Sequence, residues 1–153
     1  MDLVQRLEAI EEIKQLKARY FRCLDTKDWE AFADVFTPDA RMDMSGEVRG
    51  ANDDGVTTGN REIAAFVRRM VGDVTTVHHG HTPEIEVTSS NTATGVWAME
   101  DTLRWPEGAP LAAMHGYGHY HDRYEMADGR WRIKSTTLTR LRVDFEPSAA
   151  TRG

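Results

Sequence analysis

Three histidines fall within four residues of this chain: His78, His79 and His81. The other three histidines also lie in the second half of the sequence, within residues 115–121. Histidine is the side chain whose ordinary pKa lies nearest neutrality, and it is also a common metal ligand. Clusters of this kind therefore point either to proton transfer or to metal binding.

A zinc site built from histidines is the first interpretation to weigh. His79 and His81 are two residues apart, so a β-strand would place both imidazoles on one face. A third imidazole could come from His115 or His119, and three-histidine zinc sites exist. The chain has a single cysteine, Cys23, and it contains no His-Glu-x-x-His segment. Histidine spacing alone is a weak signal, so we expect neither a metal nor another cofactor.

Two carboxylates and a tyrosine stand in unusual places. Asp25 follows the apolar stripe of the first helical segment, at the end where the helix dipole disfavours negative charge. Asp101 is the odd member of the apolar row of its strand, where a carboxylate must be paired, hydrogen-bonded or protonated. Tyr20 lies on the apolar face of the first helix. Each of the three has two explanations, a structural hydrogen bond or a role in a pocket.

A second strand-like segment carries the remaining histidines. One of its rows contains Tyr117 and His119 with two further histidines, and the other contains Gly116, Gly118 and two tyrosines. Neither row is plainly apolar, so the pattern leaves open which row faces the core. The two glycines allow strong bending or the close approach of another group.

Apolar residues at steps of three and four predict three helices. The first runs from Leu3 to Leu24, the second follows Asp28, and the third covers residues 60–71. Between the second and third we expect a turn at 37–40, a short strand at 41–44 and a polar loop at 46–59.

After Gly72 the pattern changes to alternation, which predicts strands. The predicted strands are Val74–His81, Glu84–Thr88, Ala93–Trp105, Ala112–Met126 and Arg130–Asp144. Helices followed by long strands predict an α+β fold, in which the N-terminal helices pack on one face of a strongly curved mixed or antiparallel sheet.

The length of 153 residues predicts one domain, over residues 1–146, followed by a flexible tail at 147–153. The formal net charge of -6 argues against binding to nucleic acid or to an anionic membrane. Neither a signal peptide nor an apolar stretch of membrane-spanning length is apparent, so a cytoplasmic protein is expected.

The chain resembles the SnoaL-like branch of the nuclear transport factor 2-like superfamily, whose fold is a cone-shaped α+β barrel. The resemblance rests on residues 18–29, 76–81 and 118–133, and it extends over about residues 5–145. This fold hosts many activities, so the resemblance is more specific for the fold than for the function.

Within that family the functional patterns that fit best are those of scytalone dehydratase, hexachlorocyclohexane dehydrochlorinase and bile acid 7α-dehydratase. The resemblance implies that Asp25 and His78 form a catalytic pair. Tyr20 matches the tyrosine of the bile acid enzyme, which lies five residues before the aspartate. Scytalone dehydratase has its tyrosine directly before the aspartate, where this chain has Leu24, and Asp101 stands where its second histidine would be. Scytalone is therefore not the expected substrate.

The function that the resemblance implies is a cofactor-independent lyase or isomerase. Asp25 would bind one ring nitrogen of His78 and leave the other as general base. Tyr20 would bond the oxygen on which negative charge develops. The expected substrate is a cyclic, mostly apolar carbonyl or phenolic compound, such as a polyketide or a steroid. The residues expected to line its pocket are Phe66, Met70, Trp97, Met99, Asp101, Tyr117 and His119.

Two alternatives remain open. In one, the chain is a non-catalytic module for binding small molecules or for assembly, and the bond between Asp25 and His78 is structural. In the other, it is an accessory subunit of a ring-hydroxylating dioxygenase. Open sheet faces in this fold are usually covered by another copy of the chain, which implies a homodimer or homotrimer.

Overall fold

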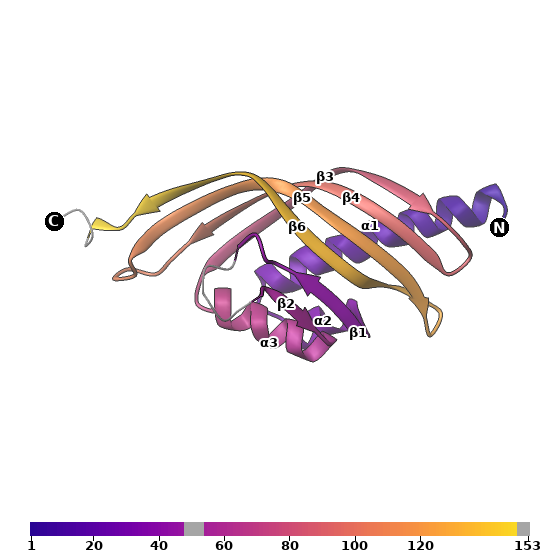
Figure 1. The fold of residues 1–153 in the computed structure, drawn as a ribbon, viewed down its shortest axis with the longest axis horizontal. Helices are drawn as coiled ribbons and strands as arrows, with labels where there is room; N and C mark the ends of the chain where they lie inside the picture. Colours follow the sequence, from indigo (N-terminus) through magenta and orange to yellow (C-terminus); the bar gives the residue numbers. More distant parts are fainter. Residues whose placement is uncertain (48–53, 150–153) are drawn as a thin grey trace.

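The computed structural model describes residues 1–47 and 54–149. Three helices lie under one six-stranded sheet that arches over them (Figure 1). The helices are α1 (Leu3–Asp25), α2 (Trp29–Asp34) and α3 (Asn60–Val71). The strands are β1 (Phe36–Asp43), β2 (Val56–Thr58), β3 (Thr75–Val87), β4 (Thr92–Arg104), β5 (Leu111–Ala127) and β6 (Arg130–Pro147).

The sheet has the strand order β2-β1-β6-β5-β4-β3. β1 pairs with β6 in parallel, and the other neighbouring pairs are antiparallel. The sheet is therefore mixed and open, and the predicted α+β class with N-terminal helices on one sheet face is confirmed.

The helix α1 runs along the inner face of the sheet (Figure 1). Asp2 caps it: the Asp2 carboxylate accepts a hydrogen bond from the Gln5 backbone N–H at 2.8 Å, and the Gln5 side-chain oxygen accepts one from the Asp2 backbone N–H at 2.9 Å. The buried side chains of α1 begin at Ala9, and the first turns project beyond the sheet. Leu3 and Leu7, which continue the apolar spacing that predicted this helix, are therefore exposed.

The end of α1 directs the chain into α2. Lys27 adopts a left-handed backbone conformation with φ of 62°, which reverses the chain after Asp25. The Asp28 carboxylate then accepts a hydrogen bond from the Ala31 backbone at 3.2 Å and caps α2, as predicted. This turn holds Asp25 beside β3 rather than in solvent.

Two strand predictions were incomplete. The turn expected at 37–40 belongs to β1, with an irregular register between Phe36 and Arg41. The two strands expected around Pro83 form a single β3, with a register shift between Gly80 and Pro83. Proline has no backbone N–H for the ladder, so the pairing continues past it only through a bulge.

The burial of alternate residues assigns the faces of the sheet. β4 buries the row that contains Trp97 and Asp101, as its polarity predicted. β5 buries the row that contains Gly116, Gly118 and Tyr120. The other row of β5, which carries Tyr117 and His119, therefore lies on the outer face.

The remaining expectations concern the surface and the chain ends. The predicted loop 46–59 contains β2, and its residues 48–53 lie outside the described residues. β6 extends to Pro147, while residues 150–153 of the predicted tail also lie outside the described residues.

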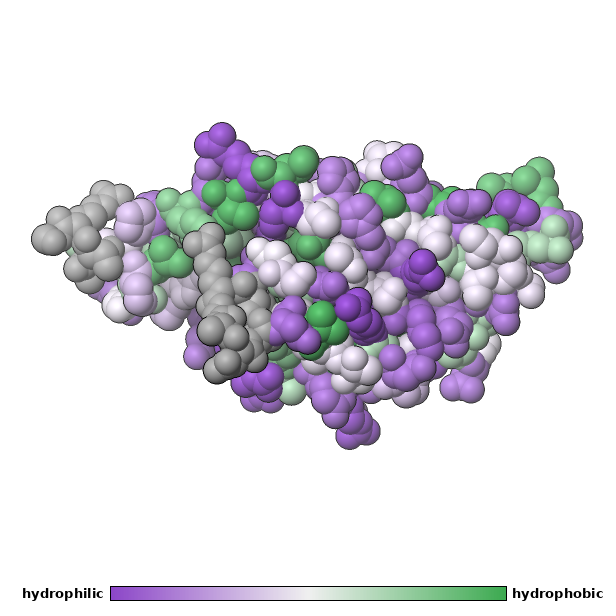
Figure 2. Space-filling view, viewed as in Figure 1, coloured by the Kyte–Doolittle hydropathy of each residue, from purple (hydrophilic) through white to green (hydrophobic). Residues whose placement is uncertain are grey.

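On the face seen in Figure 2, polar residues predominate and apolar residues form small separate groups. No helix in the described part of the chain is long and apolar enough to cross a membrane. A homo-oligomer that covers the outer sheet face stays a prediction.

Candidate active site

Asp25 and His78 are in direct contact. The ring Nδ1 of His78 donates to the Asp25 Oδ1 at 2.6 Å, and the His78 backbone N–H donates to Oδ2 at 2.9 Å. The His78 side chain is 8% exposed and that of Asp25 is 21% exposed. An imidazole whose Nδ1–H is bound in this way carries its free lone pair on Nε2.

Further donors hold the Asp25 carboxylate. Thr76 Oγ1 donates to Oδ1 at 2.9 Å, and Lys27 Nζ donates to the same Thr76 hydroxyl at 3.0 Å. Burial opposes the ionisation of Asp25, but the hydrogen bonds from His78 and Thr76 outweigh it and lower the pKa of this carboxyl below its usual value. Asp25 is thus an anion near neutral pH, as an acceptor for an imidazole must be.

A second carboxylate lies on the other side of the imidazole. Asp101 Oδ2 is 3.7 Å from His78 Nε2, which is beyond hydrogen-bonding distance. Arg140 binds Asp101 through both oxygens, at 2.7 and 3.0 Å, and its Nε donates to Glu47. Burial opposes the Arg140 charge, but these bonds outweigh it and raise the pKa of the guanidinium.

These groups meet at a pocket of about 340 Å³ between α1, α3 and the sheet. Its volume is in the range of small-molecule sites. His78, Asp101, Arg140 and Glu47 supply the ionisable part of its wall. Asp25 stands behind His78 and does not line the pocket. The apolar part of the wall includes Leu24, Met42, Met44, Phe66, Val67, Met70, Val71, Leu103, Trp105, Met114, Leu138 and Phe145.

Four of the residues expected to line the pocket are elsewhere. Trp97 is buried in the core, where its indole N–H donates to the Tyr124 hydroxyl at 2.8 Å. Met99 is also in the core, and its sulfur accepts from Arg140 at 3.6 Å. Tyr117 and His119 lie on the outer sheet face, because the glycine row of β5 faces inward. The structure therefore places these four residues outside the lining of this pocket.

Tyr20 lines the pocket as expected, together with a residue that sequence reasoning missed. Tyr120 of β5 faces it, with the ring centroids 5.7 Å apart, and both tyrosines are 2% exposed. Burial in the low-dielectric interior is the largest cause that raises the pKa of both hydroxyls, so both stay protonated and remain donors.

Sequence reasoning also missed Arg140 and Glu47. Arg140 shares a row of β6 with Thr136 and Leu138, which mixes polar and apolar residues, and Glu47 lies in a segment that was expected to be a polar loop. One signal was present: the inward Asp101 required a cationic or hydrogen-bonding partner. Nothing in the order of residues identified which of the many arginines it was.

Gly116 makes room for the pair of Asp101 and Arg140. A β-carbon at residue 116 would overlap both the guanidinium and the carboxylate. We expect Gly116→Ala to separate the pair and to lower the free energy of unfolding by about 1–3 kcal/mol. Urea denaturation measures this loss.

The matched control for that variant is Gly46→Ala. The nearest atom to a β-carbon at residue 46 is the Leu138 carbonyl oxygen, at 3.9 Å, so this change should alter stability by less than about 0.5 kcal/mol. Equal losses in the two variants would show that the close approach at Gly116 is tolerated.

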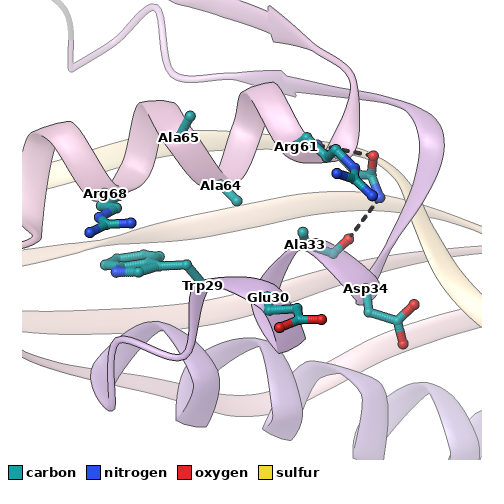
Figure 3. Close-up of a pocket in the computed structure, with 9 residues that line it drawn as sticks. Trp29, Glu30, Ala33, Asp34, Arg61, Ala64, Ala65 and Arg68 are labelled. Carbon is teal, nitrogen blue, oxygen red and sulfur yellow. Dashed lines mark hydrogen bonds between the residues drawn. The ribbon is translucent and has the colours of Figure 1, made fainter.

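A second hollow, of about 580 Å³, lies between α2 and α3. Figure 3 shows Trp29 of α2 facing α3, with Arg68 close to its ring. The Asn60 side-chain amide donates a hydrogen bond to the Ala33 carbonyl at 3.3 Å. None of the predicted site residues lines this hollow. Across the described ranges, 1–47 and 54–149, no group of three or more histidine, cysteine or acidic side chains could hold a metal ion.

Comparison with solved structures gives matches over nearly the whole chain. A type 2 hexachlorocyclohexane dehydrochlorinase, LinA, aligns with a TM-score of 0.79 and 19% identity, covering 97% of this chain and 94% of that one. A scytalone dehydratase-like protein from Novosphingobium aromaticivorans aligns with a TM-score of 0.79 and 21% identity, covering 94% and 91%. A variant of Rv3472, a protein of unknown function from Mycobacterium tuberculosis, aligns with a TM-score of 0.71 and 28% identity, covering 87% and 76%.

The sequence pattern of the SnoaL-like domain matches residues 5–137, which is most of the chain. The similar structures have the same arrangement of helices under an open sheet. The expected resemblance is confirmed, and this chain belongs to the SnoaL-like domain family.

Proposed function

We propose that this protein is a cofactor-independent lyase of the dehydratase type, acting on a cyclic, mostly apolar carbonyl or phenolic compound. The observation that carries the proposal is the bond from His78 Nδ1 to Asp25, which leaves Nε2 as a base in the wall of an apolar pocket. Similarity to a dehydrochlorinase and to a scytalone dehydratase-like protein supports an elimination. Both names denote a reaction in which a hydrogen leaves one carbon and a leaving group leaves the carbon next to it.

The proposed reaction begins at His78. Its Nε2 takes a proton from a carbon that is α or vinylogous to a carbonyl, and the C–H electron pair moves toward the carbonyl oxygen. Tyr20 donates a hydrogen bond to that oxygen as its negative charge grows. The electron pair then returns to form the C=C bond while the C–O bond to the leaving hydroxyl breaks. The proton held by His78 passes to this hydroxyl, which leaves as water.

The charges around the pocket favour a substrate that enters neutral. Asp25, Asp101 and Glu47 supply three carboxylates against two cations, the Arg140 guanidinium and the Lys27 ammonium, which reaches Asp25 through the Thr76 hydroxyl. The cluster therefore carries an excess of one negative charge while His78 is neutral. Arg140 already binds two of these carboxylates, so it offers little to an anionic substrate. Proton uptake by His78 removes this excess. Asp101 lies 3.7 Å from the Nε2 that becomes protonated, so its carboxylate stabilises the new positive charge. The site thus stabilises the cation that the reaction creates.

Replacing Asp25 by asparagine tests the role of the carboxylate. An amide cannot hold the His78 Nδ1–H and balance the imidazolium charge as the carboxylate does, so kcat should fall by about 10²–10⁴-fold. The assay first requires a substrate, which a thermal-shift screen of polyketide, steroid and terpenoid carbonyl compounds can supply, because a ligand of the native state raises the melting midpoint.

Asp28→Asn is the matched control for this change. Asp28 caps α2, and asparagine caps helices as well as aspartate does, so turnover should be unchanged. A ligand that binds both Asp25→Asn and the parent protein without being converted by either would favour the non-catalytic binding module instead.

A further inference from the structure

The turn at the end of α1 has a lysine in a position that usually holds glycine. The Asp28 backbone N–H donates to the Cys23 carbonyl at 2.9 Å, and the Lys27 backbone N–H donates to the Leu24 carbonyl at 3.1 Å. These two bonds define a helix end in which the residue after the cap is left-handed and is most often glycine. Here that residue is Lys27, with φ of 62°. A β-carbon is strained in this conformation, so the turn itself gives no reason for a lysine.

A positive φ outside glycine is uncommon in this chain. Across residues 1–47 and 54–149, the other residue of this kind is Asp128, in the turn between β5 and β6. Aspartate tolerates the left-handed conformation because its short polar side chain can bond to the backbone nearby. A lysine side chain offers no such local bond, so the reason for Lys27 must lie where its ammonium group is bound.

The ammonium group of Lys27 reaches back toward β3. Its Nζ donates to the Thr76 hydroxyl oxygen at 3.0 Å and lies 5.9 Å from the centroid of the Trp29 ring. Because an ammonium group can only donate, the single proton of the Thr76 hydroxyl is left for another acceptor. That acceptor is Asp25 Oδ1, at 2.9 Å. Lys27 therefore fixes the direction of this bond, from the hydroxyl to the carboxylate.

The same carboxylate oxygen binds the imidazole. Asp25 Oδ1 also accepts from His78 Nδ1, at 2.6 Å. Thr76 is 3% exposed, so water does not compete for its proton. A hydroxyl that accepts a bond from a cation is polarised by it and donates more strongly. A chain of three hydrogen bonds thus runs from Lys27 through Thr76 and Asp25 to His78.

We propose that Lys27 is a positioning residue, which holds the Asp25 carboxylate against His78 Nδ1 through the Thr76 hydroxyl. The inference rests on the proposed function, because the placement of His78 matters for catalysis only if His78 is the base. It gives a role in the site to a residue that does not line the pocket. It also explains why a lysine occupies the glycine position of the helix end.

The ring proton of His78 tests the proposal without any substrate. A proton held between Nδ1 and a carboxylate, in a side chain that is 8% exposed, should give a magnetic resonance signal downfield of the backbone amides. Loss of the signal in His78→Ala assigns it. Its exchange with water measures how often the bond between His78 and Asp25 opens. The parent protein is compared with Lys27→Gly, Thr76→Val and the double variant, and each sample is also melted.

The exchange should be about tenfold faster in Lys27→Gly, because the site loses a hydrogen bond from a charged group. The melting midpoint should fall by no more than about 2 °C, because glycine relieves the strain of the turn and offsets the lost side-chain contacts. Thr76→Val, which leaves the turn unchanged, should speed the exchange at least as much. The double variant should match Thr76→Val, because Lys27 acts through the hydroxyl.

Asp128→Gly is the matched control. It relieves the same kind of strain in the turn between β5 and β6, and it removes a side chain that is 94% exposed. The exchange of the His78 ring proton should stay within about twofold of the parent value, since the two sites share no partner.

Three results would overturn the proposal. The first is an unchanged exchange rate in Lys27→Gly or in Thr76→Val. The second is an effect of Lys27→Gly that adds to that of Thr76→Val in the double variant. The third is a midpoint that falls further in Lys27→Gly, which would show that the lysine stabilises the helix end itself. None of these bears on His78 as a base, which full turnover in His78→Ala would refute while leaving the chain of bonds in place.

Discussion

Replacing His78 by alanine is expected to reduce kcat by about 10³–10⁴-fold on a substrate found by the screen, while the fold is retained. The change removes the only base that the proposed elimination uses. It also leaves the Asp25 carboxylate with its bonds from the Thr76 hydroxyl and the residue 78 backbone, so the end of α1 should stay attached to β3. Steady-state kinetics and thermal melting on the same sample measure the two quantities.

His79→Ala is the control for this prediction. His79 is the next residue of β3, but its side chain is on the exposed outer face, where its ring lies 6.5 Å from that of His81. This variant should keep the parent rate within about twofold. Added imidazole should restore part of the activity of His78→Ala with a substrate that leaves room for it in the pocket. With a substrate too large to leave that room, it should restore none. An unchanged kcat in His78→Ala would refute the assignment of this residue.

The second large effect is on stability. Lys17→Met should lower the free energy of unfolding by about 3–5 kcal/mol, because it leaves the Asp122 carboxylate buried without its cation. Burial lowers the pKa of Lys17, and the contact with Asp122 opposes that shift, so the ammonium and the carboxylate depend on each other. Urea denaturation at neutral pH gives the loss directly.

Two companion variants separate this effect from simple loss of a lysine. Lys14→Met removes an exposed lysine from the same helix, and its effect should be within about 0.5 kcal/mol. Adding Asp122→Asn to Lys17→Met removes the uncompensated charge and should recover part of the lost stability. A loss below about 1 kcal/mol in Lys17→Met alone would mean that Asp122 finds another partner.

The elements of the fold were largely predictable because their patterns are local. The spacing of apolar residues gave α1 and α3, and alternation gave the long strands from β3 to β6. The predictions failed where local and tertiary preferences differ. Leu3 and Leu7 continue the apolar stripe of α1, yet the sheet ends before it reaches them. Pro83 signals the end of a strand, yet the pairing with β4 carries β3 past it.

The site divides in the same way. The sequence by itself determined that Asp25 stands at an unfavourable helix end, that Asp101 is an inward carboxylate, and that a histidine cluster follows the third helix. Only the tertiary structure decided that His78 faces inward while His79 faces out, and that Tyr117 and His119 face away from the pocket. Strand alternation defines two rows but selects neither when both mix polar and apolar residues, so the packing of α1 against β3 makes the choice.

The partners of the buried charges were likewise decided by the tertiary structure. Asp101 pairs with Arg140, 39 residues away, and Lys17 pairs with Asp122, 105 residues away. The sequence shows that a buried carboxylate needs a cation, since the cost of burying it alone is prohibitive. Which cation satisfies it depends on which strands lie side by side and on the room that a glycine such as Gly116 leaves between them, and those are properties of the assembled sheet.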